Sequence, residues 1–242
     1  MSDTPDAFPL SAIGRLESDY PDKFGIPRQP GLADAARATL VLTPPYDDPL
    51  AVRGLDAFSH LWLTFVFHLS PARWTPLVRP PRLGGNAKVG VFASRSTHRP
   101  NRLGLSLVEL TGIDTEGGVR LHLRGADLVD GTPVLDIKPY LPWAEARPEA
   151  RAGFAPAPPE ALPVRLAPMA EAALAARPDA ASLRPLIHQV LAQDPRPGYR
   201  RGAEERVYGV RLRDLDVRFR AVSADDGATA LEVVEIVAVQ GA

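Results

Sequence analysis

The sequence predicts a mainly β N-terminal domain, either a barrel or a sandwich, followed by a small domain that mixes helices and strands. Two observations support this fold class. Short strand-like segments with no long helix between them fill the first 145 residues. Seven prolines then fall between residues 142 and 168, and the pattern beyond them changes to helical spacing. A chain of 242 residues can hold one large and one small domain.

Five segments before the prolines have the composition of strands. The clearest is Leu-Trp-Leu-Thr-Phe-Val-Phe-His-Leu, an aromatic and β-branched run typical of a buried strand. Gly112 and the pair Gly117-Gly118 supply turns near the last two segments. The five predicted strands cover residues 38–42, 61–69, 89–93, 105–110 and 119–123.

The proline-rich stretch predicts an extended linker over residues 146–168, because proline has no amide donor and restricts the residue before it. The predicted domains are therefore residues 1–145 and 169–242. In the second, Asp225-Asp226-Gly227 predicts a turn between strands. The elements expected there are helices over 168–176 and 180–193 and strands over 207–212, 217–222 and 231–239.

The charges are unevenly distributed, although the net charge is only −1. Between Asp56 and Glu109 there is no acidic residue. Glycines and prolines interleave this window, which favours a surface that binds an anion over a merely solvated basic face. The basic residues in the window are Arg73, Arg79, Arg82, Lys88, Arg95, Arg99 and Arg102.

Several classes of protein are excluded. The absence of cysteine rules out disulfides, zinc ribbons and iron–sulfur clusters. No two glycines are separated by a single residue, so there is no Rossmann fingerprint, and neither a P-loop nor a nucleophile elbow occurs. His60 and His68, eight residues apart on one predicted strand, are interpreted as structural histidines and not as a metal pair. Without a membrane-length apolar run or a secretory signal, we expect a cytoplasmic protein that binds no membrane.

Three polar clusters carry the candidate chemistry. Residues 23–31 form a stiff loop around Arg28 and Gln29. Residues 78–106 combine arginines with adjacent glycines, which suits a phosphate or carboxylate ligand. Residues 127–140 crowd ionisable groups beside apolar ones, where pKa values are often shifted. From the residues alone, two alternatives stay open: an enzyme, or a non-catalytic barrel that binds RNA or a phosphorylated small molecule.

At these clusters the sequence resembles the TrmO-type (TsaA-like) tRNA methyltransferases, which act on N6-threonylcarbamoyladenosine. The resemblance is close over about residues 10–145 and looser in the C-terminal part. The segments that carry it are Pro27–Gly31, Val52–Trp62, Arg79–Asn86, Arg95–Asn101, Asp130–Pro142 and Ala192–Pro197.

The resemblance implies a homodimer, a single closed β-barrel in place of a Rossmann domain, and S-adenosylmethionine as the cofactor. No metal ion is expected. The residues implied to contact the cofactor are Pro27, Arg28, Gln29, His68, Leu69, Arg95, Leu105, Asp130, Gly131, Thr132, Pro133, Val134 and Leu135.

The implied reaction is methyl transfer to the N6 nitrogen of threonylcarbamoyladenosine beside the anticodon of tRNA. This nitrogen is a poor nucleophile that must lose a proton, so a general base is expected nearby. We predict Asp136 as that base, with Tyr140 and Lys138 orienting or polarising the acceptor. The C-terminal domain is expected to help hold the tRNA. The predicted tRNA contacts are Arg79, Arg82, Lys88, Arg99, Asn101, Arg196, Arg200 and Arg201.

Overall fold

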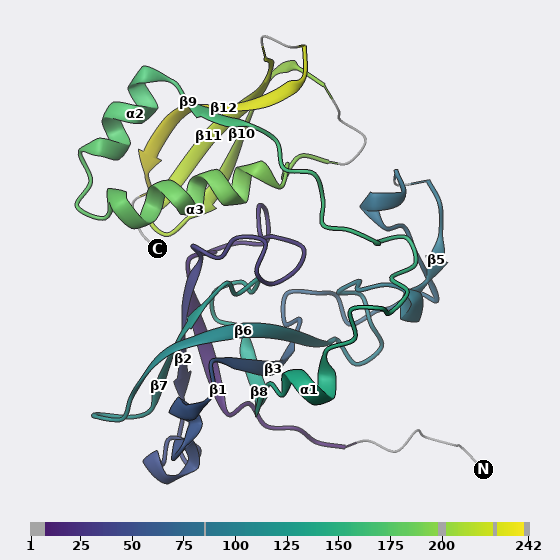
Figure 1. The fold of residues 1–242 in the computed structure, drawn as a ribbon, viewed down its shortest axis with the longest axis vertical. Helices are drawn as coiled ribbons and strands as arrows, with labels where there is room; N and C mark the ends of the chain where they lie inside the picture. The colour runs from purple at the N-terminus through teal and green to yellow at the C-terminus, as the bar shows by residue number, and fades with distance from the viewer. Residues whose placement is uncertain (1–7, 85, 198–201, 225–226, 240–242) are drawn as a thin grey trace.

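The computed structural model describes residues 8–84, 86–197, 202–224 and 227–239. A closed six-stranded barrel lies below a small α+β domain, and an arm projects from the side of the barrel (Figure 1). The predicted fold class, with a closed barrel first and a small α+β domain second, is confirmed. No helix in these described ranges is both long and apolar enough to cross a membrane.

The barrel is antiparallel throughout, in the order β1-β2-β7-β6-β3-β8. Leu16, Leu40, Leu63 and Leu121 point inward and are almost fully buried in its core. Closure joins β1 to β8, where Gly14 pairs with Val134, and leaves no free sheet edge. The barrel strands are β1 (Gly14–Ser18), β2 (Arg37–Leu42), β3 (His60–Val66), β6 (Leu103–Asp114), β7 (Arg120–Arg124) and β8 (Pro133–Pro139).

The strand predicted as fully buried, β3, is half-buried. Its inward residues alternate with Trp62, Thr64 and Val66, which face outward because a barrel strand has only one side in the core. The strand also ends at Val66, so His68 lies beyond it and does not share it with His60. The prediction that the two histidines lie on one strand is therefore wrong.

The two ends of the barrel carry different segments. At one end β1, β3 and β7 finish and β2, β6 and β8 begin, so the long connections 19–36, 67–102 and 125–132 all leave from it. We call this the loop end. The opposite end, the far end, carries the connection 43–59 with the 3₁₀ turns η1 (Pro49–Val52) and η2 (Leu55–Ala57).

The arm, residues 67–102, has almost no core of its own. Val91 is the one fully buried hydrophobic residue in its described part, while Trp74, Leu77 and Phe92 are exposed. The strand predicted over residues 89–93 is shorter in the structure, because a 3₁₀ turn replaces its second half. The elements of the arm are β4 (Leu77–Val78), η3 (Pro81–Leu83), β5 (Val89–Gly90) and η4 (Val91–Ala93).

The second domain has a four-stranded sheet in the order β10-β11-β12-β9, with two helices against it (Figure 1). Strand β9 lies inside the stretch predicted as linker, just after Pro163. It is an edge strand paired with β12 only, a position that tolerates nearby proline. Asp225 and Asp226 of the predicted turn lie outside the described residues. The elements of this domain are β9 (Val164–Leu166), α2 (Pro168–Ala175), α3 (Ala180–Ala192), β10 (Glu204–Leu212), β11 (Leu215–Ser223) and β12 (Thr229–Ala238), whereas the short helix α1 (Pro142–Glu145) lies beside the barrel after β8 (Figure 1).

The core of this second domain includes residues from the start of the chain. Tyr20, Ala33 and Ala36 are at most 2% exposed and pack in one cluster with Ile187 and Val190 of α3. All three come from the loop that joins β1 to β2, which lies beneath α3 in Figure 1. The barrel and the second domain are therefore joined by a shared core as well as by the linker.

Candidate functional site

The segments predicted to contact the cofactor come together at the loop end of the barrel. Lys23 Nζ donates to the Leu69 carbonyl over 3.2 Å and joins the first segment to the second. Arg15 Nη1 donates to the Gly131 carbonyl over 3.0 Å, and the charge of the same guanidinium acts on His68. Residues far apart in the sequence thus form one surface around the ends of β1, β3 and β8.

The loop of residues 23–31 presents a cation to this surface. Pro27 is buried, whereas Arg28 is exposed and forms no ion pair with any described residue. Gln29 donates its side-chain amide to the Arg28 carbonyl, and the Gly31 amide donates to the Gly125 carbonyl over 2.9 Å. The loop is therefore held at its base while the Arg28 guanidinium stays available for an anionic ligand.

His68 supplies an unused polar atom at the same end. Its ring nitrogen Nδ1 is buried and finds no hydrogen-bond partner in the described part of the chain. Burial, and then the charge of Arg15, lower the pKa of His68 below its usual value, so the imidazole is neutral at pH 7. A buried nitrogen of this kind fits a ligand that completes its hydrogen bonding.

A carboxylate lies beside these cations. Ser106 Oγ donates to Asp127 Oδ1 over 2.6 Å, and Arg95 Nη2 donates to the carbonyl of the neighbouring Leu105 over 3.4 Å. Burial raises the pKa of Asp127 to about 6, against the opposing effects of the Ser106 hydrogen bond and the Arg95 charge. Asp127 was not predicted as a site residue. An aspartate four residues after the predicted strand 119–123 was visible in the sequence, but its burial was not.

Of the three predicted catalytic residues, Asp136 and Lys138 lie on the outer side of β8, and Tyr140 directly follows this strand. Asp136 pairs with Thr64, which in turn pairs with Leu105, so Asp136 is the nearest of the three to the loop end. Lys138 pairs with Trp62 one step further along. The Tyr140 amide donates to the His60 carbonyl over 2.9 Å, at the opposite end of β3.

The length of β3 separates Tyr140 from the predicted cofactor residues. Six residue steps of a strand span about 20 Å, which is the distance along β3 from His60 to Val66. The edge of the Tyr140 ring packs against Trp62, with 5.9 Å between the ring centroids. Within one chain, the structure therefore does not bring Tyr140 to the loop end.

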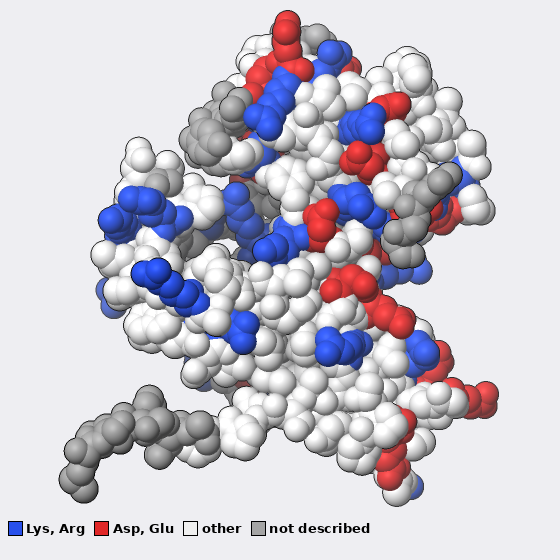
Figure 2. Space-filling view, turned by 180° about the vertical axis from the view of Figure 1, so that it is seen from behind, with Lys and Arg blue, Asp and Glu red and all other residues white. Residues whose placement is uncertain are grey.

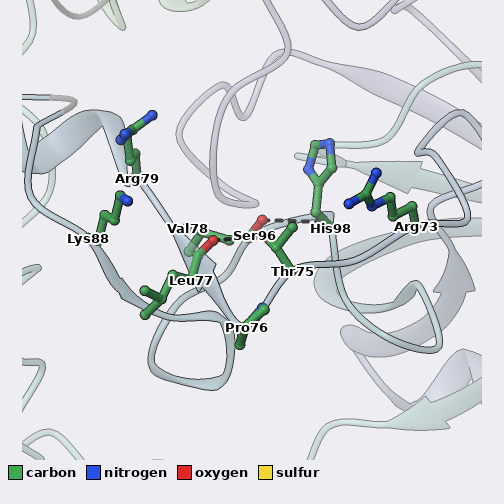
Figure 3. Close-up of a pocket in the computed structure, with 9 residues that line it drawn as sticks. All are labelled: Arg73, Thr75, Pro76, Leu77, Val78, Arg79, Lys88, Ser96 and His98. Carbon is green, nitrogen blue, oxygen red and sulfur yellow. Dashed lines mark hydrogen bonds between the residues drawn. The ribbon is translucent and has the colours of Figure 1, made fainter.

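The arm carries the basic window and a pocket of about 650 Å³. Arg73 and His98 lie on one side of this pocket and Arg79 and Lys88 on the other (Figure 3). Basic side chains also gather around the hollow between the arm and the two domains (Figure 2). Because the arm contains no acidic residue, this pocket attracts anions such as backbone phosphates.

Two family models together match most of the chain. The tRNA-methyltransferase O N-terminal domain matches residues 15–146, and the TrmO C-terminal domain matches residues 159–239. The chain belongs to the TrmO family. The resemblance inferred from the sequence motifs is confirmed.

Known members of the TrmO family align with nearly the whole chain. A tRNA (adenine(37)-N6)-methyltransferase of Escherichia coli (strain K12) is 50% identical over 231 residues, which are 93% of this chain and 98% of that protein. A putative S-adenosylmethionine-dependent methyltransferase RcsF of Pseudomonas aeruginosa is 52% identical over 215 residues, 87% of this chain and 91% of the relative. The crystal structure of TrmO from Pseudomonas aeruginosa covers 96% of this chain and 99% of its own, with a TM-score of 0.78 and 42% identity. This TrmO chain is thus an enzyme, and the non-catalytic alternative falls away.

Of the tRNA contacts predicted on the arm of this TrmO protein, three have side chains that form no hydrogen bond or ion pair with the described residues. Arg79 and Lys88 line the pocket, and Asn101 is exposed. Arg82 instead donates to the Ala157 carbonyl and ties the arm to the linker. Arg99 donates to the Ser94 carbonyl over 2.9 Å and lies over the Phe92 ring, so it holds the fold of the arm.

The prediction that Arg196 contacts tRNA is wrong. The residue is 2% exposed, and its guanidinium pairs with Asp194 at 2.7 Å and lies near Glu204. Its charge is therefore used inside the domain, where it supports the connection between α3 and β10. The other two predicted contacts, Arg200 and Arg201, lie outside the described residues.

We expect Asp127→Asn to make this TrmO protein more stable at pH 7.5. The folded pKa of Asp127 lies above that of an unfolded aspartate, so the folded state binds the extra proton between about pH 4 and 6. Above that window the ionised carboxylate costs about 3 kcal/mol, whereas the asparagine retains the acceptor for Ser106 and avoids this cost. In urea unfolding, the free energy of unfolding of the variant should exceed that of wild type by this amount at pH 7.5, and the two should be equal near pH 4. A constant difference at both pH values would contradict the proposed cause.

Proposed function

We propose that this TrmO protein transfers the methyl group of S-adenosylmethionine to the N6 nitrogen of threonylcarbamoyladenosine 37 in tRNA. One structural observation carries the proposal: the Arg28 loop, His68 and the Gly131 turn meet at the loop end, around a buried ring nitrogen without a partner. The methyltransferase names of relatives that align with nearly the whole chain support the same activity.

The residues at the loop end suit the groups of this cofactor. When bound, S-adenosylmethionine supplies a methyl group on a sulfonium, with a leaving group that is already activated. Arg28 and Arg95 would hold its carboxylate, while Asp127 offers negative charge to its cationic part. The turn from Asp130 to Leu135 would form a wall of the site. The activated leaving group requires no metal ion.

The protein groups align the acceptor and take up its proton. We assign Asp136 as the base that removes the proton from the N6 nitrogen, a role worth about a hundred-fold in rate. Lys138 and Tyr140 would orient the acceptor, and alignment of donor and acceptor contributes more than the base does. Arg79 and Lys88 would hold backbone phosphates of the tRNA. Because its substrate is tRNA, the enzyme would work in the cytoplasm.

A homodimer would complete this site. The outer side of β3 and β6 is largely apolar: Leu105 is 49% exposed, and Trp62 and Leu107 are partly exposed beside it. Trp74 and Phe92 of the arm are also exposed. A second copy covering these surfaces would bury apolar area and bring its own Lys138 and Tyr140 towards the loop end of the first.

Cofactor titration of arginine variants tests the placement of the site. We expect Arg28→Ala and Arg95→Ala each to raise the Kd for S-adenosylmethionine about 10-fold or more, since each loses a charge-assisted hydrogen bond. Both side chains are exposed, so the fold should be unaffected. Arg120→Ala is the matched control, because it removes an exposed arginine at the far end whose ion pair among the described residues is with Glu17, at 3.6 Å. Calorimetry that gives all three variants the wild-type Kd would show that the site is misplaced.

A further inference from the structure

We propose that the C-terminal domain contributes to cofactor binding, because its residues Gln189 and Arg213 hold the loop that carries Arg28. Both are positioning residues for cofactor binding. The inference rests on the cofactor placement proposed above, and it assigns the second domain a role beyond any contact with tRNA. The loop concerned is residues 19–36, between β1 and β2.

Gln189 on α3 holds the second half of this loop with both ends of its amide. Its Oε1 accepts a hydrogen bond from the Ala35 amide over 2.8 Å. Its Nε2 donates to the carboxylate of Asp34. One side chain thus fixes both a backbone group and a side chain of the loop, just after the Arg28 segment.

Arg213 holds the first half. It lies in the turn between β10 and β11 with a left-handed backbone (φ 52°), and its amide donates to the Asp19 carbonyl over 2.9 Å. Its Nε donates to Asp19 Oδ1 over 2.8 Å. The other oxygen of the buried Asp19 accepts from the Arg37 amide over 2.8 Å, so Asp19 joins the barrel to the second domain.

The network behind Arg213 keeps it in place. Its Nη1 donates to Asp179 Oδ2 and to Ser182 Oγ, each over 2.9 Å. Hydrogen bonds from Arg177 and then Arg213 lower the pKa of Asp179 to about 2, so this pairing persists throughout the neutral pH range.

Close packing adds to these hydrogen bonds. Gly25 has φ +90°, and a Cβ atom built there would lie 2.0 Å from Cγ2 of Val210. The loop therefore touches β10 at a point where no side chain fits. On its other side, Lys23 bonds to Leu69 of the arm and Gly31 bonds to Gly125 in the β7–β8 connection of the barrel, so Arg28 projects from a segment that is held on both sides.

A loop held in this way is already ordered before the cofactor arrives. Releasing one attachment lets the loop populate other conformations. The apparent Kd for the cofactor equals the intrinsic Kd divided by the fraction of molecules whose loop is in the binding conformation, so the apparent Kd rises as this fraction falls. The effect should fall on cofactor binding and not on tRNA binding, because neither Gln189 nor Arg213 lies on the arm.

Gln189→Ala in the full-length protein tests the inference. We expect the Kd for S-adenosylmethionine to rise about 5- to 10-fold, while the Kd for tRNA measured without cofactor changes less than 2-fold. Hydrogen exchange of amides in residues 24–35 should quicken, with β3 and β6 unaffected. Arg184→Ala is the matched control: it lies on the same helix and removes a surface pair with Glu171 at 2.8 Å that does not touch the loop.

A rescue variant separates positioning from general damage to the fold. Gln189→Glu places a second carboxylate against Asp34 and should weaken cofactor binding. Adding Asp34→Asn supplies a donor to the new carboxylate, which can still accept from the Ala35 amide, and should return the Kd to within 2-fold of wild type.

The variants distinguish the two proposals. If Arg28→Ala raises the Kd and Gln189→Ala leaves it unchanged, the cofactor placement stands and the positioning role is wrong. If neither variant changes the Kd, the cofactor placement itself has failed and the inference fails with it. A weakened Gln189→Glu protein that Asp34→Asn does not rescue would also overturn the role of this contact.

Discussion

tRNA that lacks the threonylcarbamoyl group on adenosine 37 is expected to bind this enzyme and to receive no methyl group. In the proposed arrangement, binding would come from phosphates that meet the basic arm around Arg79 and Lys88, and such contacts carry no information about the modified base. Transfer depends on the modification in two ways. Its carboxylate gives an arginine a charged partner, and acylation makes the N6 proton easier to remove. A site built for a charged group leaves its donors unpaired when that group is missing, which costs about 10,000-fold or more in rate.

Methyl-labelled cofactor with the two tRNAs measures this selectivity directly. We expect label in the modified tRNA only, and comparable retention of both tRNAs on a filter, with affinity that falls steeply as salt rises. Equal labelling would mean that ordinary adenosine suffices and that the modification is not recognised. A labelled product with the methyl group elsewhere than on the N6 nitrogen would refute the proposed chemistry.

Mixing two inactive variants is expected to restore about a quarter of wild-type activity if the site is shared between subunits. Arg28→Ala damages the loop end, whereas Lys138→Ala removes an exposed side chain on the outer side of β8. Each proposed site combines the loop end of one subunit with Lys138 of the other. In a mixed dimer, one such site therefore carries both substitutions and the other site carries neither. Random exchange gives one half mixed dimers, each with one intact site, hence about a quarter of the full activity.

The matched control mixes Arg28→Ala with Arg95→Ala. Both arginines belong to the loop end of the same chain, so each composite site keeps one damaged residue and no activity should return. Restoration in this control as well would show that subunit mixing alone does not report on a shared site. Wild-type activity from an enzyme that sediments as a monomer would contradict the dimer outright.

The strand positions that close the barrel could not be predicted from local sequence. Residues 133–139 are not among the strands predicted from the sequence, and the Asp130-Gly131 pair just before them signals only a tight turn. In the structure these residues form β8, which pairs with β1 and β3. Those partners lie far away in the sequence, so only the tertiary pairing shows the strand. The helical spacing of α3, by contrast, is a local pattern, and it was predicted to within a residue.

The sequence predicted which segments form the candidate site, but it did not predict which of their charged side chains are buried. The motifs around Arg28, His68 and Asp130 were identified by resemblance, and the structure brings them to one end of the barrel. Arg196 was assigned to tRNA because a sequence shows a charge without its partner, and Asp194 and Glu204 use that charge internally. Asp127 was not predicted as a site residue, because nothing in the local sequence shows that its carboxylate is buried.

The shared core has a consequence for the order in which the chain can mature on the ribosome. Tyr20, Ala33 and Ala36 emerge early, yet α3 and the β10–β12 sheet that cover them are made near the end of synthesis. The barrel strands are complete by residue 139, so the barrel can close while its β1–β2 loop still lacks cover. A nascent or truncated chain that stops in the linker therefore has a barrel with an unsupported cofactor loop. On the proposed placement of the cofactor, competence to bind the methyl donor would be gained last, once the second domain has folded onto a segment translated more than a hundred residues earlier.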